Sequence, residues 1–166
     1  MDSLTKFWVD QIEQQSKVLK LYPILGIAHS LLHNETDCLM RCGGGWINYA
    51  IQTDGYILPC PIMWGMKAYY MGHIKNADPM QLPKRFVEEK PCCECKIMGL
   101  CGGRCLYTNI TKRWPDDIYG KVCYTVEQLI ESVKRQMPRI QQFIAAGKIG
   151  LQDFDYSKYN GAEIIP

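Results

Sequence analysis

The segment "PCCECKIMGLCGGRC", residues 91–105, places five of the chain's nine cysteines within fifteen positions. The other four stand at positions 38, 42, 60 and 123. The N-terminal "MDSLTKFW" lacks the basic and apolar segments of a secretory signal. An odd number of cysteines without an export signal is typical of metal binding or catalysis rather than of a disulfide framework. The sequence therefore predicts thiolate metal sites, and a disulfide-stapled secreted binder is the least favoured interpretation.

The cysteines separate into an early group and a late group, which predicts two sites. Four thiolates complete either a tetrahedral zinc ion or a [4Fe–4S] cluster, so eight of the nine cysteines would fill two such sites. Spacing alone leaves open both the metal and the division of the ligands. A structural or interaction module with two zinc ions is accordingly the alternative function, since C-x2-C pairs are common zinc ligands.

The order of the cysteines carries a resemblance to a known family. Cys42 begins a C-x12-G-x4-C run that ends at Cys60, the late group reads C-x2-C-x5-C-x3-C from Cys92 to Cys105, and Cys123 follows after a gap. This pattern resembles the seven-cysteine signature of the SPASM domain, the auxiliary-cluster domain of radical SAM enzymes that modify peptides and proteins. The resemblance covers residues 42–123.

The resemblance implies an α+β fold in which a β-hairpin and short helices surround two [4Fe–4S] clusters. It assigns one cluster to a set of four cysteines: Cys92, Cys95, Cys101 and Cys123. It assigns the other cluster to Cys42, Cys60 and Cys105. Cys38, which precedes Cys42 by four positions, is the expected fourth ligand there, with Cys93 or an open iron as the alternatives.

A radical SAM enzyme cleaves S-adenosylmethionine at a cluster held by C-x3-C-x2-C, and these 166 residues contain no such triplet. Gly45 and Thr108 stand where the third cysteine would be needed. The chain is therefore not expected to be catalytic alone. It is expected to work with a radical SAM barrel, as an excised domain, a fragment of a split gene or an accessory subunit. The family role implies electron relay or positioning of a peptide or protein substrate, and complete cysteine ligation favours relay.

Three segments are predicted around this pattern: a helical linker region over 1–37, the double-cluster domain over 38–123, and a helix with a tail over 124–166. Apolar spacing predicts a helix from Leu4 to about Leu21 and a second, after Pro23, to about His33. Residues 45–60 predict two strands joined at 53–55, and residues 78–89 a short helix. Beyond Cys123 apolar steps of three and four predict the C-terminal helix, with a kink at Pro138.

Several further features refine these expectations. Glycines 43–45 and 102–103 beside the ligands would let backbone N–H groups face sulfur. Two oxidised clusters would move the formal charge of +2 to about −2, which nearby basic residues would offset. Those residues are Arg41, Lys90, Lys96 and Arg104.

The remaining side chains receive structural interpretations. The Met- and Tyr-rich residues 61–72 are expected to shield a cluster rather than to receive a peptide or the barrel. His29, His33 and His73 are expected to be structural, and Asp116 and Asp117 to form a turn. No concentrated basic stripe indicates nucleic-acid binding and no apolar run is long enough for a membrane helix, so we expect a cytoplasmic protein.

Overall fold

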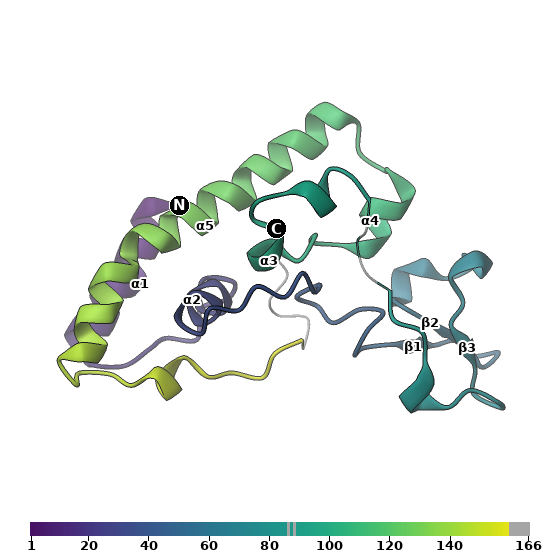
Figure 1. Ribbon diagram of the computed structural model, residues 1–166, viewed down its shortest axis with the longest axis horizontal. Coiled ribbons are helices and arrows are strands. Elements are labelled where there is room, and N and C mark those ends of the chain that lie inside the picture. The colour runs from purple at the N-terminus through teal and green to yellow at the C-terminus, as the bar shows by residue number, and fades with distance from the viewer. Residues whose placement is uncertain (86, 88, 160–166) are drawn as a thin grey trace.

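The computed structural model of the chain describes residues 1–85, 87 and 89–159. It combines helices with one small antiparallel sheet, which confirms the α+β class. In Figure 1 the helices α1, α2 and most of α5 lie at one end of the molecule, and the sheet lies at the other. The short helices α3 and α4 lie between these two ends.

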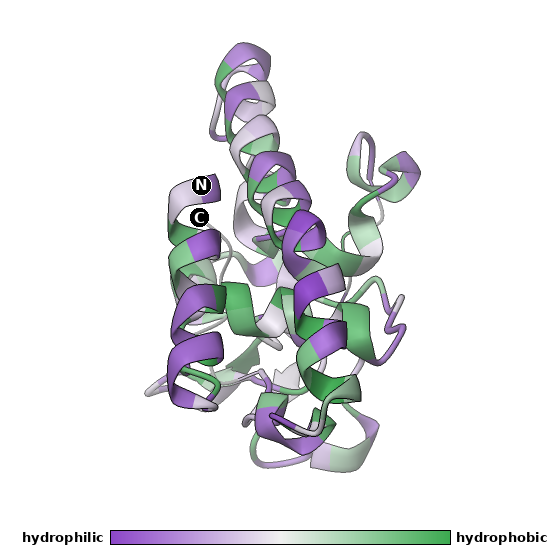
Figure 2. Ribbon diagram, turned by 90° about the vertical axis from the view of Figure 1, so that its left-hand side faces the viewer, coloured by the Kyte–Doolittle hydropathy of each residue, from purple (hydrophilic) through white to green (hydrophobic). Residues whose placement is uncertain are grey.

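The helical region consists of α1 (Asp2–Gln15), α2 (Ile24–Leu32) and α5 (Asp116–Ala145), together with the 3-10 helix η5 (Leu151–Phe154). Both α1 and α2 pack on α5 and bury a common apolar core, the helical core, which includes Trp8, Ile130 and Phe154. Figure 2 shows hydrophilic and hydrophobic residues alternating around the long helices. This is the pattern of helices that bury one face and expose the other.

The first helix ends earlier than its apolar spacing predicts. Ser16 adopts a left-handed conformation, with φ of 49°, and its N–H bonds to the carbonyl of Ile12. The chain after Ser16 is not helical, although Val18 is still buried in the helical core. The break therefore lies at Ser16 rather than at Pro23, but the predicted second helix after Pro23 is confirmed, because α2 begins at the next residue.

The last helix begins earlier than predicted. Asp116 and Asp117 form its first turn rather than a separate turn, and the preceding Pro115 caps it. Carboxylates are favourable at a helix N-terminus, where the peptide dipoles concentrate positive charge. The helix continues through Pro138 to Ala145. Its apolar spacing becomes regular only after Cys123 because the earlier turns face the thiols rather than the helical core.

The sheet contains strands β1 (Ala50–Ile51), β2 (Tyr56–Leu58) and β3 (Gly72–His73). Strands β1 and β2 form the predicted hairpin, with Ala50 opposite Leu58. Strand β3 was not predicted; it pairs antiparallel with β2, with Ile57 opposite Gly72. The strand order is β1-β2-β3, so β2 lies in the middle of the sheet. Pro59 and Cys60 follow directly after β2 in the chain.

Between β2 and α5, apart from β3, the described residues form only short helices. These are α3 (Met98–Cys101), α4 (Leu106–Thr111) and four 3-10 helices. The 3-10 helices are η1 (Pro61–Met63), η2 (Lys67–Tyr69), η3 (Pro79–Gln81) and η4 (Cys92–Glu94). The helix predicted within 78–89 is reduced to η3 among the residues described there.

A second buried cluster lies around the cysteines and is separate from the helical core. Its fully buried members include Met40 and Met63, and three of the cysteines belong to it or pack against it. Residues before position 38 and after position 123 contribute to the same helical core, so the first and third predicted segments pack together. Helix α5 also crosses the predicted boundary at 123. The boundaries at 37 and 123 stay a prediction. None of the helices in the described part of the chain has the length and apolarity needed to cross a bilayer.

Candidate metal centres

The first group of thiols consists of Cys42, Cys60 and Cys105. Cys60 follows the central strand β2, and Cys105 caps the N-terminus of α4. Burial raises the pKa of the Cys60 thiol, and the neighbouring thiols of Cys105 and Cys42 raise it further. Like groups raise each other's thiol pKa only at close range, so the fold brings together cysteines that lie up to 63 positions apart in the chain (105 minus 42).

The second group consists of Cys92, Cys95, Cys101 and Cys123. The first two lie on and just after η4, Cys101 ends α3, and Cys123 lies in the second turn of α5. Burial raises the pKa of Cys101 to about 11, and the thiols of Cys92 and Cys123 contribute in the same direction. The pKa of Cys123 is raised by burial and then by Cys92 and, more weakly, Cys95. These are the four cysteines that the family resemblance assigns to one cluster.

Backbone N–H groups point at sulfur in both groups. The N–H of Gly44 donates to Cys42 Sγ over 3.4 Å, and the N–H groups of Ile62 and Gly103 bond to Cys60 and Cys101. The last two bonds lower the thiol pKa and so favour the thiolate. The expectation that the glycines would permit such bonds is confirmed at Gly44 and Gly103, which lie next to or in left-handed backbone.

Gly102 fixes the position of one cysteine loop against the other. Its φ is +67°, and a Cβ added there would lie 2.1 Å from the carbonyl oxygen of Leu39. Only glycine permits this approach, because any side chain would overlap the backbone of the opposite segment. Arg41 reinforces the contact, since its Nε donates to the carbonyl of Leu100 over 2.9 Å. The loop that carries Cys42 is thereby held against the loop that carries Cys101.

Apolar side chains surround the thiols. Met40 and Met63 are 1% and 0% exposed, and Met98 is also buried. Of residues 61–72, which are expected to shield a cluster, Met63 is buried in the group against which Cys42 and Cys60 pack, whereas the neighbouring Trp64 is 63% exposed. Excluding water in this way lowers the local dielectric, so that charges and hydrogen bonds near the thiols act more strongly.

Cys38 and Cys93, the two candidates for the fourth position of the first group, are both exposed. The Cys38 Sγ lies 3.8 Å from the carbonyl oxygen of Thr36, and the N–H of Cys93 bonds to the carbonyl of Glu89. Neither is among the thiols that act on Cys60. The choice between them, and an open position, stays a prediction.

Of the four basic residues expected to offset cluster charge, Arg104 acts on the thiols directly. It lowers the pKa of both Cys101 and Cys123, which favours their thiolate forms. Arg41 is buried and bonds to backbone carbonyls, and Lys90 forms an exposed ion pair with Glu94. Lys96 is not among the residues that shift the thiol pKa of Cys60, Cys101 or Cys123 in the described part of the chain.

A hydrogen-bonded trio that the sequence did not predict lies beside Cys92. The Tyr119 hydroxyl lies 3.1 Å from Cys92 Sγ and donates to Asn109 Oδ1 over 2.8 Å. The buried Asn109 amide donates in turn to the carbonyls of Gly103 and Cys105. Burial and the adjacent Cys92 raise the pKa of Tyr119, so it remains a hydrogen-bond donor. Asn109 thus connects the backbone of a first-group cysteine with the thiol of a second-group cysteine.

A cavity of about 240 Å³ opens next to α4. Its lining includes Tyr69, Lys84, Arg85, Glu89 and Asn109, so it combines an aromatic wall with two cations and a carboxylate. His73, expected to be structural, bonds through its ring to the carbonyl of Asp54 and braces the hairpin turn.

Comparisons of the chain with family models, with curated proteins and with solved structures each found no match.

Proposed function

We propose that the chain binds two [4Fe–4S] clusters and serves as the SPASM-type auxiliary domain of a radical SAM system that modifies a peptide or protein. The observation that carries the proposal is the gathering of the thiols into two groups of the composition that the resemblance implies. The barrel that binds S-adenosylmethionine belongs to the same parent protein or to a separate subunit. A cytoplasmic location is part of the proposal, because all nine cysteines are free thiols.

The second group offers a complete ligand set. Cys92, Cys95, Cys101 and Cys123 would hold one cluster by four thiolates, and Cys42, Cys60 and Cys105 would hold the other with Cys38 as fourth ligand. When bound, such clusters supply one-electron transfer at potentials set by hydrogen bonds to sulfur, burial and charge. The chain provides each of these: N–H bonds at Gly44 and Gly103, the methionine shell, and the Arg104 guanidinium.

The described residues fit electron relay better than substrate ligation. A cluster with four protein thiolates has no open iron for a substrate, and the second group supplies four. Asn109 and Tyr119 link the two groups by hydrogen bonds over a short path. Asn109 and Tyr119 would keep the two centres close together and exclude water from them, while the barrel cleaves S-adenosylmethionine.

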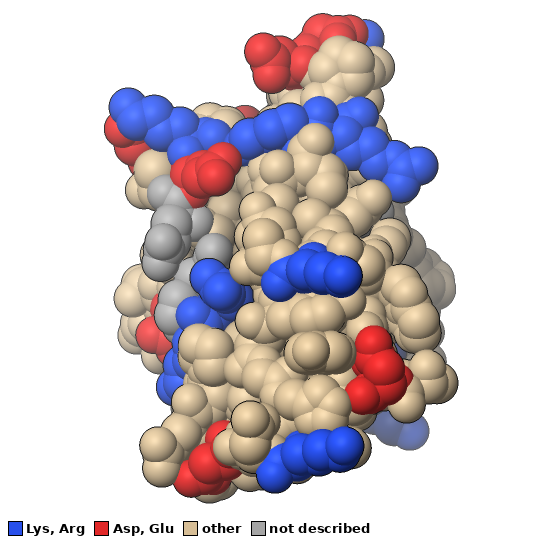
Figure 3. All heavy atoms as spheres, turned by 90° about the vertical axis from the view of Figure 1, so that its right-hand side faces the viewer, with Lys and Arg blue, Asp and Glu red and all other residues tan. Residues whose placement is uncertain are grey.

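The side of the sheet is the surface we propose for the barrel. Figure 3 views that side: several basic side chains lie along its upper part, and much of the remaining surface is uncharged. Large apolar residues of the sheet and its following turns are exposed, with Ile51 and Trp64 each 63% and Ile74 56% accessible. Exposed apolar side chains of this size are typical of interaction surfaces when they cluster.

Anaerobic reconstitution followed by iron, sulfide and zinc analysis tests the proposal. We expect about eight irons per chain, almost no zinc, and visible absorption that dithionite bleaches. Cys101→Ala should remove about half of the iron. A Cys38→Ala variant that loses iron while Cys93→Ala retains it would assign the fourth ligand. A colourless protein that holds two zinc ions would instead establish the structural module with two zinc ions.

A further inference from the structure

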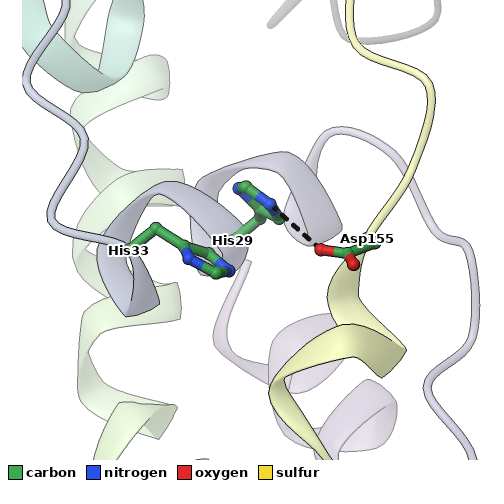
Figure 4. Close-up of side chains that lie close together, drawn as sticks. All are labelled: His29, His33 and Asp155. Carbon is green, nitrogen blue, oxygen red and sulfur yellow. Dashed lines mark ion pairs between the residues drawn. The ribbon is translucent and has the colours of Figure 1, made fainter.

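A third group of potential ligands lies outside the cysteine region, between α2 and the C-terminal segment. His29 lies on α2, His33 ends it, and Asp155 follows η5. One ligand atom from each of the three lies within 4.8 Å of the other two. Figure 4 shows both imidazole rings on the same side of α2, with the Asp155 carboxylate reaching His29 from the opposite segment.

The histidine spacing places both rings on one helix face. Residues four apart in a helix are neighbours on its surface, and the rings of His29 and His33 stack with centroids 4.3 Å apart. The Asp155 Oδ1 atom lies 3.6 Å from His29 Nε2. This separation is too long for a hydrogen bond but suits two ligands on either side of one ion.

One nitrogen of the buried His29 ring lacks a hydrogen bond. Its side chain is 8% exposed, and its Nδ1 has no hydrogen-bond partner among the described residues. The Glu35 Oε2 atom lies 3.6 Å from that Nδ1 and is itself held by the Ser30 hydroxyl at 3.0 Å. A histidine that ligates a metal through one nitrogen usually directs its other N–H to a carboxylate, which is the role Glu35 is placed to take.

Carboxylates flank the buried ring of His29, which suits a cation: the Glu35 and Asp155 oxygens each lie 3.6 Å from one of its nitrogens. Lys158 is paired with Glu35, which leaves the Asp155 carboxylate to face the rings. His33 and Asp155 are exposed, so solvent can complete the coordination.

We propose that His29, His33 and Asp155 bind one divalent transition-metal ion of the zinc class, with water in the remaining position and Glu35 orienting His29. Two imidazoles and a carboxylate are an established ligand set for such ions. The ion would join α2 to the C-terminal segment, which already pack together. This proposal does not depend on what the cysteines bind.

Zinc titration of the protein with its thiol sites already occupied tests the proposal. We expect one further zinc ion per chain by calorimetry, and zinc-edge X-ray absorption of that ion with nitrogen and oxygen ligands but no sulfur. His33→Gln and Asp155→Asn should each weaken this binding at least tenfold. Glu35→Gln should weaken it by about ten- to a hundredfold, as loss of an orienting carboxylate does. His73→Gln, which changes a histidine outside the group, should bind as the parent does.

Asp155→Asn keeps the test informative if a histidine variant fails to fold, because Asp155 is 64% exposed and outside the core. Equal zinc binding by the parent and by Asp155→Asn, or no zinc beyond the thiol sites, overturns the proposal. If the cysteines prove to hold zinc rather than iron, the proposed function fails, but the loss of one sulfur-free zinc in Asp155→Asn still supports this site.

Discussion

The helical region and the cysteine region differ in how much apolar core they bury. Sixteen buried residues form one core in the helical region, whereas the buried cluster around the thiols has six, one of which is Cys92. The cysteine region comprises residues 36–85, 87 and 89–113, together with Tyr119 and Cys123 at the start of α5. The helices α1, α2 and α5 also satisfy their own backbone hydrogen bonds, while the cysteine region has only short elements. Apolar burial therefore suffices for the helical region, and the cysteine region depends on close backbone contacts and on what its thiols bind.

If the thiols hold metal as proposed, removing it should have the largest effect, and this effect should be confined to the cysteine region. Chelation under anaerobic conditions is expected to lower amide hydrogen-exchange protection by orders of magnitude around η4, α3 and α4, because ligand binding there is coupled to folding. Protection of α1 and of α5 after residue 126 should change little. Equal loss in both regions would show that one cooperative unit depends on the metal.

Ile130→Ala tests the helical region in the opposite direction. Ile130 is fully buried, so we expect the free energy of unfolding to fall by about 2–5 kcal/mol in urea titrations. The metal content of the folded protein should remain at the parent value, because Ile130 belongs to the helical core alone. Ile118→Ala, at an exposed position of the same helix, is the matched control.

Gly102→Ala should disrupt the cysteine region through one added methyl group. The new Cβ would overlap the Leu39 carbonyl, so we expect loss of stability and of bound metal. Gly147→Ala is the matched control because Gly147 has the same φ of +67° but nothing within 4 Å. The control isolates the cost of placing alanine in left-handed backbone, about 1–2 kcal/mol. The difference between the two variants in urea unfolding should exceed about 2 kcal/mol, and similar stabilities would contradict the close approach.

In the metal-free chain, alkaline pH should destabilise the cysteine region. Burial raises the pKa of Cys101 from 9.0 to about 11, so its neutral thiol stabilises the fold below pH 9 and this contribution is lost as the pH rises to about 11. Cys60 and Cys123 shift in the same direction. We expect unfolding free energies to fall by about 1–3 kcal/mol over this range, since one pKa unit corresponds to about 1.4 kcal/mol. Cys101→Ala should flatten the profile, and a parent profile that rises with pH would refute the assignment.

Tyr119→Phe should produce the smallest change. If the second group holds a cluster, the Cys92 thiolate can only accept, so the Tyr119 hydroxyl would donate to it in place of Asn109. Phenylalanine removes that hydrogen bond and should make the reduction potential more negative. A hydrogen bond contributes about 0.5–1.5 kcal/mol, which corresponds to roughly 20–60 mV for one electron. Spectroscopic redox titration measures the shift, and Tyr124→Phe, an exposed residue of the same helix, should leave the potential unchanged.

The sequence predicted features that repeat along the chain or lie close together in it. Apolar spacing located α2 and the main part of α5, and the turn at 53–55 located the hairpin. Strand β3 was missed because two residues, Gly72 and His73, carry no alternation. The start of α5 was missed because Tyr119 and Cys123 face the thiols, which removes the apolar period that marks the rest of the helix.

The predicted ligand sets are those that the family resemblance implies, whereas the side chains around them could be identified only in the folded chain. Tyr119 and Asn109 meet Cys92 only through tertiary packing, and no sequence motif marks them. His29 and Asp155 are 126 positions apart (155 minus 29), so their approach is also invisible in the sequence. The spacing of His29 and His33 on one helix face was the available signal.

Helix α5 belongs to both regions. Thirty residues at 1.5 Å per residue make a rod of about 45 Å, with Tyr119 and Cys123 near one end and the helical core along the remainder. A small tilt of the end that carries Cys123, such as a change in ligand geometry would impose, is carried along the rod as a larger sideways displacement. A change at the thiol site of Cys123 would therefore alter the packing of α1 against the far turns of α5.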